Sequence, residues 1–178
     1  MALPRSARHR PPVASKNDAE DPRERNGVRR TLTLNGTAFI SAESPLSPAD
    51  GPFSVLAWIK GGAPGQTILA QGSGANWLAT DALTGALMTE LSRGGRAAVA
   101  LLSEAVVTDG NWHRIAFTWD GRSRRLYVDG VLAAKDAQDS LAASSANLVV
   151  RAGKTMAPGT FWSGRIDDVR IYRRAVKP

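Results

Sequence analysis

The acidic side chains of this sequence are the first candidates for catalysis. Two carboxylates that cleave a glycosidic bond must face each other, and on a β-strand they stand two positions apart because alternate residues share a face. The glutamates of the chain are Glu20, Glu24, Glu43, Glu90 and Glu104. None of them has a second carboxylate two residues away within a predicted strand, so we expect no glycosidase of this kind.

Cysteine and histidine chemistry is limited in the same way. The chain has no cysteine, which excludes disulfides, thiolate zinc sites, iron–sulfur clusters and cysteine nucleophiles. Its two histidines, His9 and His113, are too few for a multi-histidine metal site. A serine nucleophile in the main part of the chain would depend on His113 alone. We therefore predict that the protein is not an enzyme and has no catalytic residues.

The elements that must position any site are short strands. From Thr31 onward, about ten short runs alternate with a period of two and show no helical apolar period. Asx-Gly pairs separate many of these runs and favour tight turns. Residues 124–135, with Asp129-Gly130 at their centre, are typical of a two-residue hairpin. The pattern predicts an all-β fold, a two-sheet antiparallel sandwich.

Alternation also predicts which side chains share a face. In residues 53–60 the odd-numbered positions form one apolar face, and the even-numbered positions include Leu56 and Trp58. Because both faces are apolar, this strand is predicted to be central and covered on both sides. In residues 112–119, His113 lies on the same face as the odd-numbered apolar residues.

The first 30 residues differ from the rest of the chain. They contain eight Lys or Arg, four acids and four prolines, and they contribute +4 of the net charge of +7. Such a segment cannot bury enough apolar surface to offset its ordering entropy. We predict an extended N-terminal arm, residues 1–30, followed by one β-sandwich domain, residues 31–178.

Three roles are open for this arm: a solvated tail, an assembly arm that lies on neighbouring subunits, or a nucleic-acid tail. The acids interrupt its basic charge and it has no aromatic residue for stacking, so nucleic acid is the least favoured partner. The residues of an assembly arm would be Arg5, Arg8, Arg10, Arg23 and Arg25.

No segment of the sequence is typical of export or membrane insertion. No apolar run approaches the roughly 18 residues that a membrane helix needs. The N-terminus is positively charged but lacks the apolar core of a secretory signal. We expect synthesis in the cytoplasm without a signal peptide and no membrane span.

Four ordered motifs resemble one known family. They are DGNWHRIAFTWDG at 109–121, LYVDG at 126–130, FSVLAWIK at 53–60 and GRIDDVRIY at 164–172. Together they resemble the laminin-G-like, concanavalin-A-like lectin/glucanase domains, and residues 34–36 match the family's opening motif loosely. The resemblance implies a jelly-roll sandwich. It also implies a recognition module that binds glycans or proteins, often with a calcium ion.

Carried over to this chain, the family's calcium site falls on Asn35 and Asp168. Calcium prefers six to eight oxygen ligands, and Asn35 supplies an amide oxygen where the family has a carboxylate. The preferred alternative is that Asn35-Gly36 is a plain turn. Asp167 and Asp168 then pair with neighbouring arginines instead of a metal.

Exposed aromatic rings next to hydrogen-bonding groups are the usual platform for sugars. Trp58, Trp112 and Trp119 belong to the motif strands and are expected in the core. Trp77, with its neighbour Asn76, and Trp162 are less constrained and are the candidate glycan-binding residues. Core packing is the open alternative for both tryptophans.

These observations favour a non-catalytic recognition or assembly module. The leading hypothesis is a bacteriophage virion structural protein, in the tail or decorating the capsid. In that case residues 1–30 would dock on other virion subunits in an oligomeric assembly, and the lectin-like domain would bind host-surface glycan. The alternatives are a stand-alone carbohydrate- or protein-binding module and a nucleic-acid-associated protein that uses its basic arm.

Overall fold

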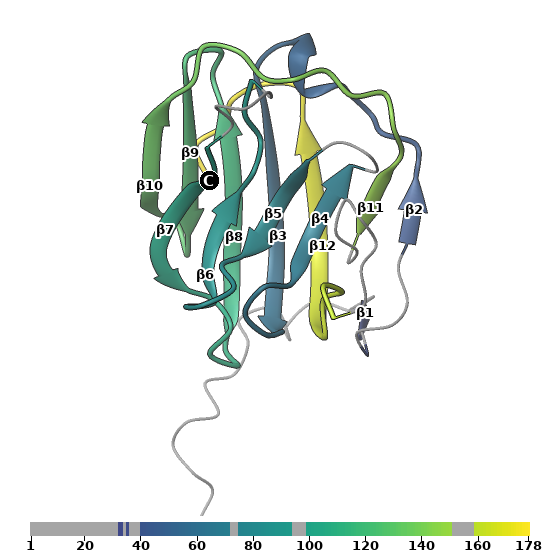
Figure 1. Ribbon diagram of the computed structural model, residues 1–178, viewed down its shortest axis with the longest axis vertical. Coiled ribbons are helices and arrows are strands. Elements are labelled where there is room, and N and C mark those ends of the chain that lie inside the picture. The colour runs from purple at the N-terminus through teal and green to yellow at the C-terminus, as the bar shows by residue number, and fades with distance from the viewer. Residues whose placement is uncertain (1–31, 34, 36–39, 72–74, 94–98, 151–158) are drawn as a thin grey trace, which may run out of the picture.

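The protein is a β-sandwich of two antiparallel six-stranded sheets (Figure 1). The computed structural model describes residues 32–33, 35, 40–71, 75–93, 99–150 and 159–178. Within these residues the helical structure is one short 3-10 turn, η1 (Pro48–Asp50). The predicted all-β jelly-roll class is therefore confirmed. None of the described helical structure is long and apolar enough to cross a membrane.

The strands of the two sheets interleave along the chain. Sheet A has the spatial order β1 (Leu32–Thr33), β12 (Gly164–Tyr172), β3 (Phe53–Gly61), β8 (Trp112–Trp119), β9 (Ser123–Val128) and β10 (Val131–Ala137). Sheet B has the order β2 (Ile40–Ala42), β11 (Leu148–Val150), β4 (Thr67–Gln71), β5 (Asn76–Thr80), β6 (Ala86–Thr89) and β7 (Leu101–Val106).

The predicted hairpin at 124–135 is confirmed. β9 and β10 pair across Asp129 and Gly130, whose φ angles are 53° and 82°. Positive φ at both central residues is the requirement of a type I′ turn. The strand β7 begins at Leu101, within the apolar run of residues 97–103. Pairing with β6 sets its position, and Leu101 lies opposite Thr89.

β3 is the central strand of sheet A, hydrogen-bonded to β12 on one side and to β8 on the other. Its odd-numbered side chains face sheet B and are at most 2% exposed. On its outer face Ser54 and Leu56 are buried, whereas Trp58 and Lys60 are partly exposed. The predicted covering of both faces therefore holds for the first half of the strand only.

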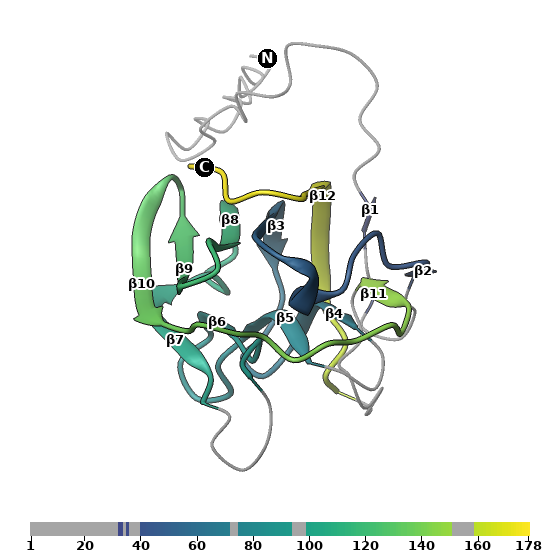
Figure 2. The same ribbon diagram turned by 90° about the horizontal axis from the view of Figure 1, so that it is seen from above.

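The C-terminal segment, residues 173–178, supplies that partial cover. Ser54 Oγ donates a hydrogen bond to the carbonyl oxygen of Arg174 and accepts one from the backbone N–H of Val176, both at 2.9 Å. Figure 2 shows the chain after β12 crossing β3 toward β8 on the side of sheet A that points away from sheet B. Farther along the same face, Trp58 and Lys60 are partly exposed.

Aromatic residues fill the centre of the space between the sheets. The ring of Phe53 lies 5.3 Å from Trp77, 5.5 Å from Phe117 and 6.5 Å from Trp119, measured between centroids. All four side chains are at most 5% exposed. Tilted and edge-on pairs of this kind contribute about 0.5–1.5 kcal/mol each beyond the burial of their surface.

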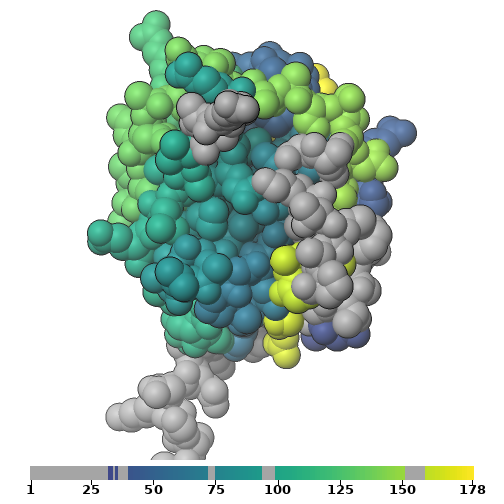
Figure 3. Space-filling view, viewed as in Figure 1, coloured from purple at the N-terminus to yellow at the C-terminus, as the bar shows by residue number. Residues whose placement is uncertain are grey.

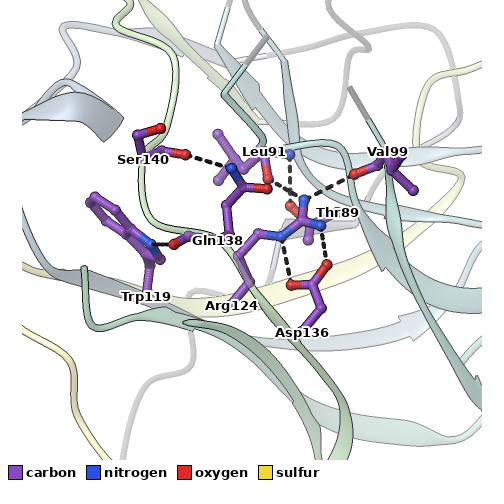
Figure 4. A network of polar contacts seen from close by, with 8 residues as sticks. All are labelled: Thr89, Leu91, Val99, Trp119, Arg124, Asp136, Gln138 and Ser140. Carbon is purple, nitrogen blue, oxygen red and sulfur yellow. Dashed lines mark hydrogen bonds and ion pairs between the residues drawn. The ribbon is translucent and has the colours of Figure 1, made fainter. Parts of the chain in front are cut away.

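A buried arginine joins the two sheets at one side of this core (Figure 4). Arg124, on β9, is 1% exposed, and its guanidinium binds the carboxylate of Asp136 on β10 in a bidentate pair. The same guanidinium donates to the backbone carbonyls of Leu91 and Val99, which follow and precede strands of sheet B. Nearby, Trp119 Nε1 donates to the carbonyl oxygen of Gln138 at 2.7 Å.

We predict that Asp136→Ala lowers the free energy of unfolding by about 3 kcal/mol, because it leaves a buried guanidinium without its counter-charge. This is the low end of the usual range, since the Asp136 side chain is 35% exposed. Urea denaturation of the full chain measures the change. The control is Asp139→Ala, which removes the exposed ion pair with Arg93 and should cost at most about 1 kcal/mol. Equal costs for the two variants would contradict the role given to Arg124.

Candidate functional site

The outer face of sheet A gathers aromatic and cationic side chains where β3 and β8 pair. Trp58 lies directly opposite Arg114, and Lys60 lies directly opposite Trp112. Opposite residues of an antiparallel pair point to the same face, so the four side chains form a two-by-two pattern in which indoles and cations alternate. We call these four residues the indole block. All four are partly exposed.

β12 extends the indole block by one column. Arg165 lies opposite Lys60, and Asp167 lies opposite Trp58. The two rows across the three strands therefore contain two indoles, three cations and one carboxylate. An arrangement of this kind can stack on a ring and can bind both acidic groups and hydroxyls.

A shallow cavity adjoins the indole block on the β12 side. Its volume is about 40 Å³, and its lining includes Trp58, Arg114, Asp168, Arg170 and Tyr172. One water molecule occupies about 30 Å³ of liquid, so the cavity accommodates a single substituent of a ligand and not a whole ring.

A β-bulge in β12 shapes this cavity. The register shifts between Asp167 and Arg170, and Asp168 in between has a φ of 51°. Bulges of this type redirect side chains. Asp168 Oδ1 accepts a hydrogen bond from Arg170 Nε at 2.8 Å, and hydrogen bonds to Asp168 and Tyr172 raise the pKa of Arg170. This ion pair forms part of the cavity wall.

His113, next to Arg114 on β8, bridges two turns. Its Nδ1 lies 2.8 Å from Asp129 Oδ2 and its Nε2 lies 2.9 Å from Asp109 Oδ1. A protonated ring has a donor on each nitrogen and can bind both carboxylates at once. Asp129 Oδ1 also accepts from the backbone N–H of Arg114 at 2.8 Å. The bridge thus fixes the backbone that presents one corner of the indole block.

This bridge shifts the pKa values of His113 and Asp109. Partial burial alone would lower the pKa of His113, but hydrogen bonds to Asp129 and Asp109 and their negative charges outweigh it and raise the pKa above 6.5. Burial would raise the pKa of Asp109. Hydrogen bonds from Asn111 and His113, together with the charge of His113, outweigh it and lower the pKa to about 2.

The structure places the predicted glycan-binding tryptophans in the core. Trp77 and Trp162 are both 0% exposed, so the expectation that they offer a free ring is wrong. Trp77 packs on Phe53, and Trp162 packs where any side chain at Gly62 would collide with its ring. Asn76 is partly exposed at the start of β5, where its backbone N–H donates to Glu90. The structure does not bring these three residues together as an exposed site.

Of the three motif tryptophans predicted in the core, only one lies there. Trp119 is in the core at 5% exposure, as expected. Trp58 and Trp112 lie on the outer face of sheet A and are only partly buried. Figure 3 looks onto the outer face of sheet B, whose strands contain one aromatic residue among those described, the buried Trp77. The aromatic surface of the sandwich is therefore on sheet A.

The residues suggested for calcium do not converge. β1 pairs with β12 so that Leu32 lies opposite Ile166 and Thr33 opposite Arg165. The chain from Thr33 toward Asn35 therefore runs away from Asp168, whose carboxylate is bound to Arg170. Among the described residues no group of three or more acidic or histidine side chains could hold a metal ion. Asn35 and Asp168 do not fit a shared calcium site, and the alternative pairing of Asp168 with arginine is confirmed.

The predicted assembly-arm residues lie outside the described part of the chain. This applies to Arg5, Arg8, Arg10, Arg23 and Arg25. Their role as a docking segment stays a prediction.

Comparison with known proteins identifies the family. Residues 34–178 match a laminin-G model of the concanavalin A-like lectin/glucanases superfamily. The chain belongs to this superfamily. The resemblance inferred from the four sequence motifs is thereby confirmed. No curated protein matches the chain significantly.

Three solved structures show how widely this fold is shared. The binding domain of Paraclostridial Mosquitocidal Protein 1 superposes with a TM-score of 0.62 at 13% identity, covering 82% of this chain and 40% of that one. A heptameric SAP-like pentraxin from Limulus polyphemus gives 0.61 at 15%, covering 82% and 76%. Domains LG4-5 of the mouse laminin α1 chain give 0.60 at 12%, covering 82% and 42%. The chain thus spans less than half of the first and third proteins, and these identities establish a common fold only.

We predict that the stabilising effect of His113 depends on pH. Because folding raises its pKa above 6.5, its contribution is complete below pH 6.5 and is lost as the pH rises through the folded-state pKa. The difference in unfolding free energy between the natural chain and His113→Asn should be larger at about pH 5.5 than at about pH 9, measured by urea denaturation. His9 is present in both proteins and cancels. A difference that stays constant with pH would contradict the bridge.

Proposed function

We propose that the protein is a non-catalytic recognition module and that its ligand lies on the indole block. The observation that carries this proposal is the distribution of the five tryptophans. Three fill the core, and the other two lie diagonally on the outer face of sheet A with cations beside them. Both indoles are partly exposed, and partly exposed aromatic rings beside polar groups are typical of ligand-binding surfaces.

The ligand that suits this surface best is a glycan. The flat apolar face of a sugar ring stacks on an indole, and its hydroxyls bind carboxylates and guanidinium groups. Similar folds include binding domains of toxins, among them the binding domain of a botulinum neurotoxin. That likeness supports a recognition role for this chain, in which host-surface glycan is the proposed ligand.

We further propose that the module works as part of a larger particle, as a bacteriophage tail or capsid-decoration protein. The support is the composition of residues 1–30, in which arginines and prolines suit docking on neighbouring subunits. Mass spectrometry of purified particles from the producing cells is the test. Detection of the chain at a fixed copy number supports this role, and its absence from the particles contradicts it. A stand-alone binding module is then the remaining form of the proposal.

We predict that Trp58→Ala abolishes glycan binding and leaves the fold intact. The variant removes a ring that stands partly in solvent, so it leaves no cavity in the core. Glycan-array binding of the full chain measures the loss, and thermal unfolding checks the fold. Trp77→Ala is the matched variant for a core tryptophan and should cost about 3–5 kcal/mol of stability. Full glycan binding by a folded Trp58→Ala protein would refute the proposed site.

A further inference from the structure

We infer that the indole block binds a saccharide that carries carboxylate groups, such as a polyuronate. This inference rests on the proposed function, because it names the ligand class of the same site. It is carried by the charge of the outer face of sheet A, by the order of its side chains along β3 and β8, and by the position of its two carboxylates.

The charge of this face is strongly positive. The strands of this face contain two acids, Asp167 and Asp168. The register of sheet A places six cations on the same face, which are Lys60, Arg114, Arg125, Lys135, Arg165 and Arg170. Among the described residues, Arg125 binds Asp120 at 2.7 Å and Arg170 binds Asp168 at 2.8 Å. Around the two indoles the three cations Lys60, Arg114 and Arg165 outnumber the single carboxylate, Asp167. A face of this sign favours an acidic ligand.

The order of the side chains suits an acidic sugar. Directly opposite residues on antiparallel strands have Cβ atoms about 4.5–5.5 Å apart, and diagonal neighbours lie about 7–8 Å apart. Each indole thus has one cation opposite it and another two residues along its own strand, as Trp58 has Arg114 and Lys60. A sugar ring stacked on Trp58 would bring its carboxylate to the guanidinium of Arg114, which can bind both oxygens at once.

The two carboxylates of the face distinguish a saccharide from a single-stranded nucleic acid. Asp167 lies opposite Trp58, and Asp168 lines the shallow cavity beside it. Carboxylates accept hydrogen bonds from hydroxyl groups, of which each ring of a saccharide has several and a DNA backbone has none. The cavity of about 40 Å³ accommodates one such hydroxyl substituent and not a base.

The experiment measures binding of the full chain to three polyuronates by calorimetry: polygalacturonate, alginate and hyaluronan. Each is compared with its methyl ester, which keeps the sugar rings and removes the charge. We expect at least one of the acids to bind and its ester to bind at least about tenfold more weakly, since the ester cannot form the charge-assisted hydrogen bonds of the carboxylate. Affinity for the acid should also fall as salt is added.

Variants of the cations locate the binding. Arg114→Gln and Lys60→Gln should each weaken binding of the acid by a larger factor than binding of the ester. Arg114→Lys should restore only part of the affinity, because an ammonium group cannot form the bidentate pair. Lys135→Gln is the control, since Lys135 is exposed on the same face but lies on β10 at the edge of the sheet. Equal losses for Lys135→Gln and Arg114→Gln would show a general charge effect and overturn the inference.

The remaining outcomes separate this inference from the proposed function. If acid and ester bind equally and both lose binding in Trp58→Ala, the ligand is not selected for its carboxylates. The inference is then overturned, and the indole block is still supported as the recognition site. If none of the three acids binds, the inference is overturned. The proposed function is then still supported if the protein binds a neutral glycan and loses that binding in Trp58→Ala. Tighter binding of a single-stranded oligodeoxythymidylate than of all three acids overturns the inference in favour of nucleic acid.

Discussion

The burial of one face of β3 is the constraint on which the rest of the molecule depends. Phe53, Val55 and Ile59 are 0% exposed against sheet B, and β3 is paired over its length with both β8 and β12. Because side chains alternate along a strand, the intervening positions have to point outward. The C-terminal segment covers Ser54, and Trp58 and Lys60 farther along the outer face are partly exposed. Core packing thereby determines which positions of β3 face outward.

Two sets of buried or partly buried polar contacts fix the strands and turns around this surface. Arg124 reaches from β9 across the core to carbonyls at the ends of strands of sheet B, so the two sheets are joined by more than apolar contact. His113 ties the turns around Asp109 and Asp129 to the start of β8. His113 lies on β8, which flanks β3, and Arg124 lies on β9, the next strand of the sheet. Side chains on paired strands are held more precisely than side chains on loops, which is the condition for recognition without rearrangement.

The sequence predicts the strands and turns of this protein well, because alternation and Asx-Gly turns are local signals. Burial of Trp77 and Trp162 could not be predicted, since every residue from Trp77 to Thr80 in β5 is buried and alternation gives no exposed face there. Its place in a motif strand indicated a core role for Trp58, but a motif does not tell which residues of the strand face the core and which face outward. Arg124 did leave a signal, because it alternates with the apolar residues at 126 and 128. The bulge at Asp168 had none.

The most direct test of the recognition surface is a nuclear magnetic resonance titration that follows the five indole N–H signals, one for each tryptophan. Polygalacturonate, alginate and hyaluronan are added in turn to the full chain, with the signals assigned by single Trp→Phe variants. Our account predicts that one of these acids shifts the signals of Trp58 and Trp112 and leaves those of Trp77, Trp119 and Trp162 in place. Shifts confined to the three core indoles, or no shift with any of the acids, would contradict it.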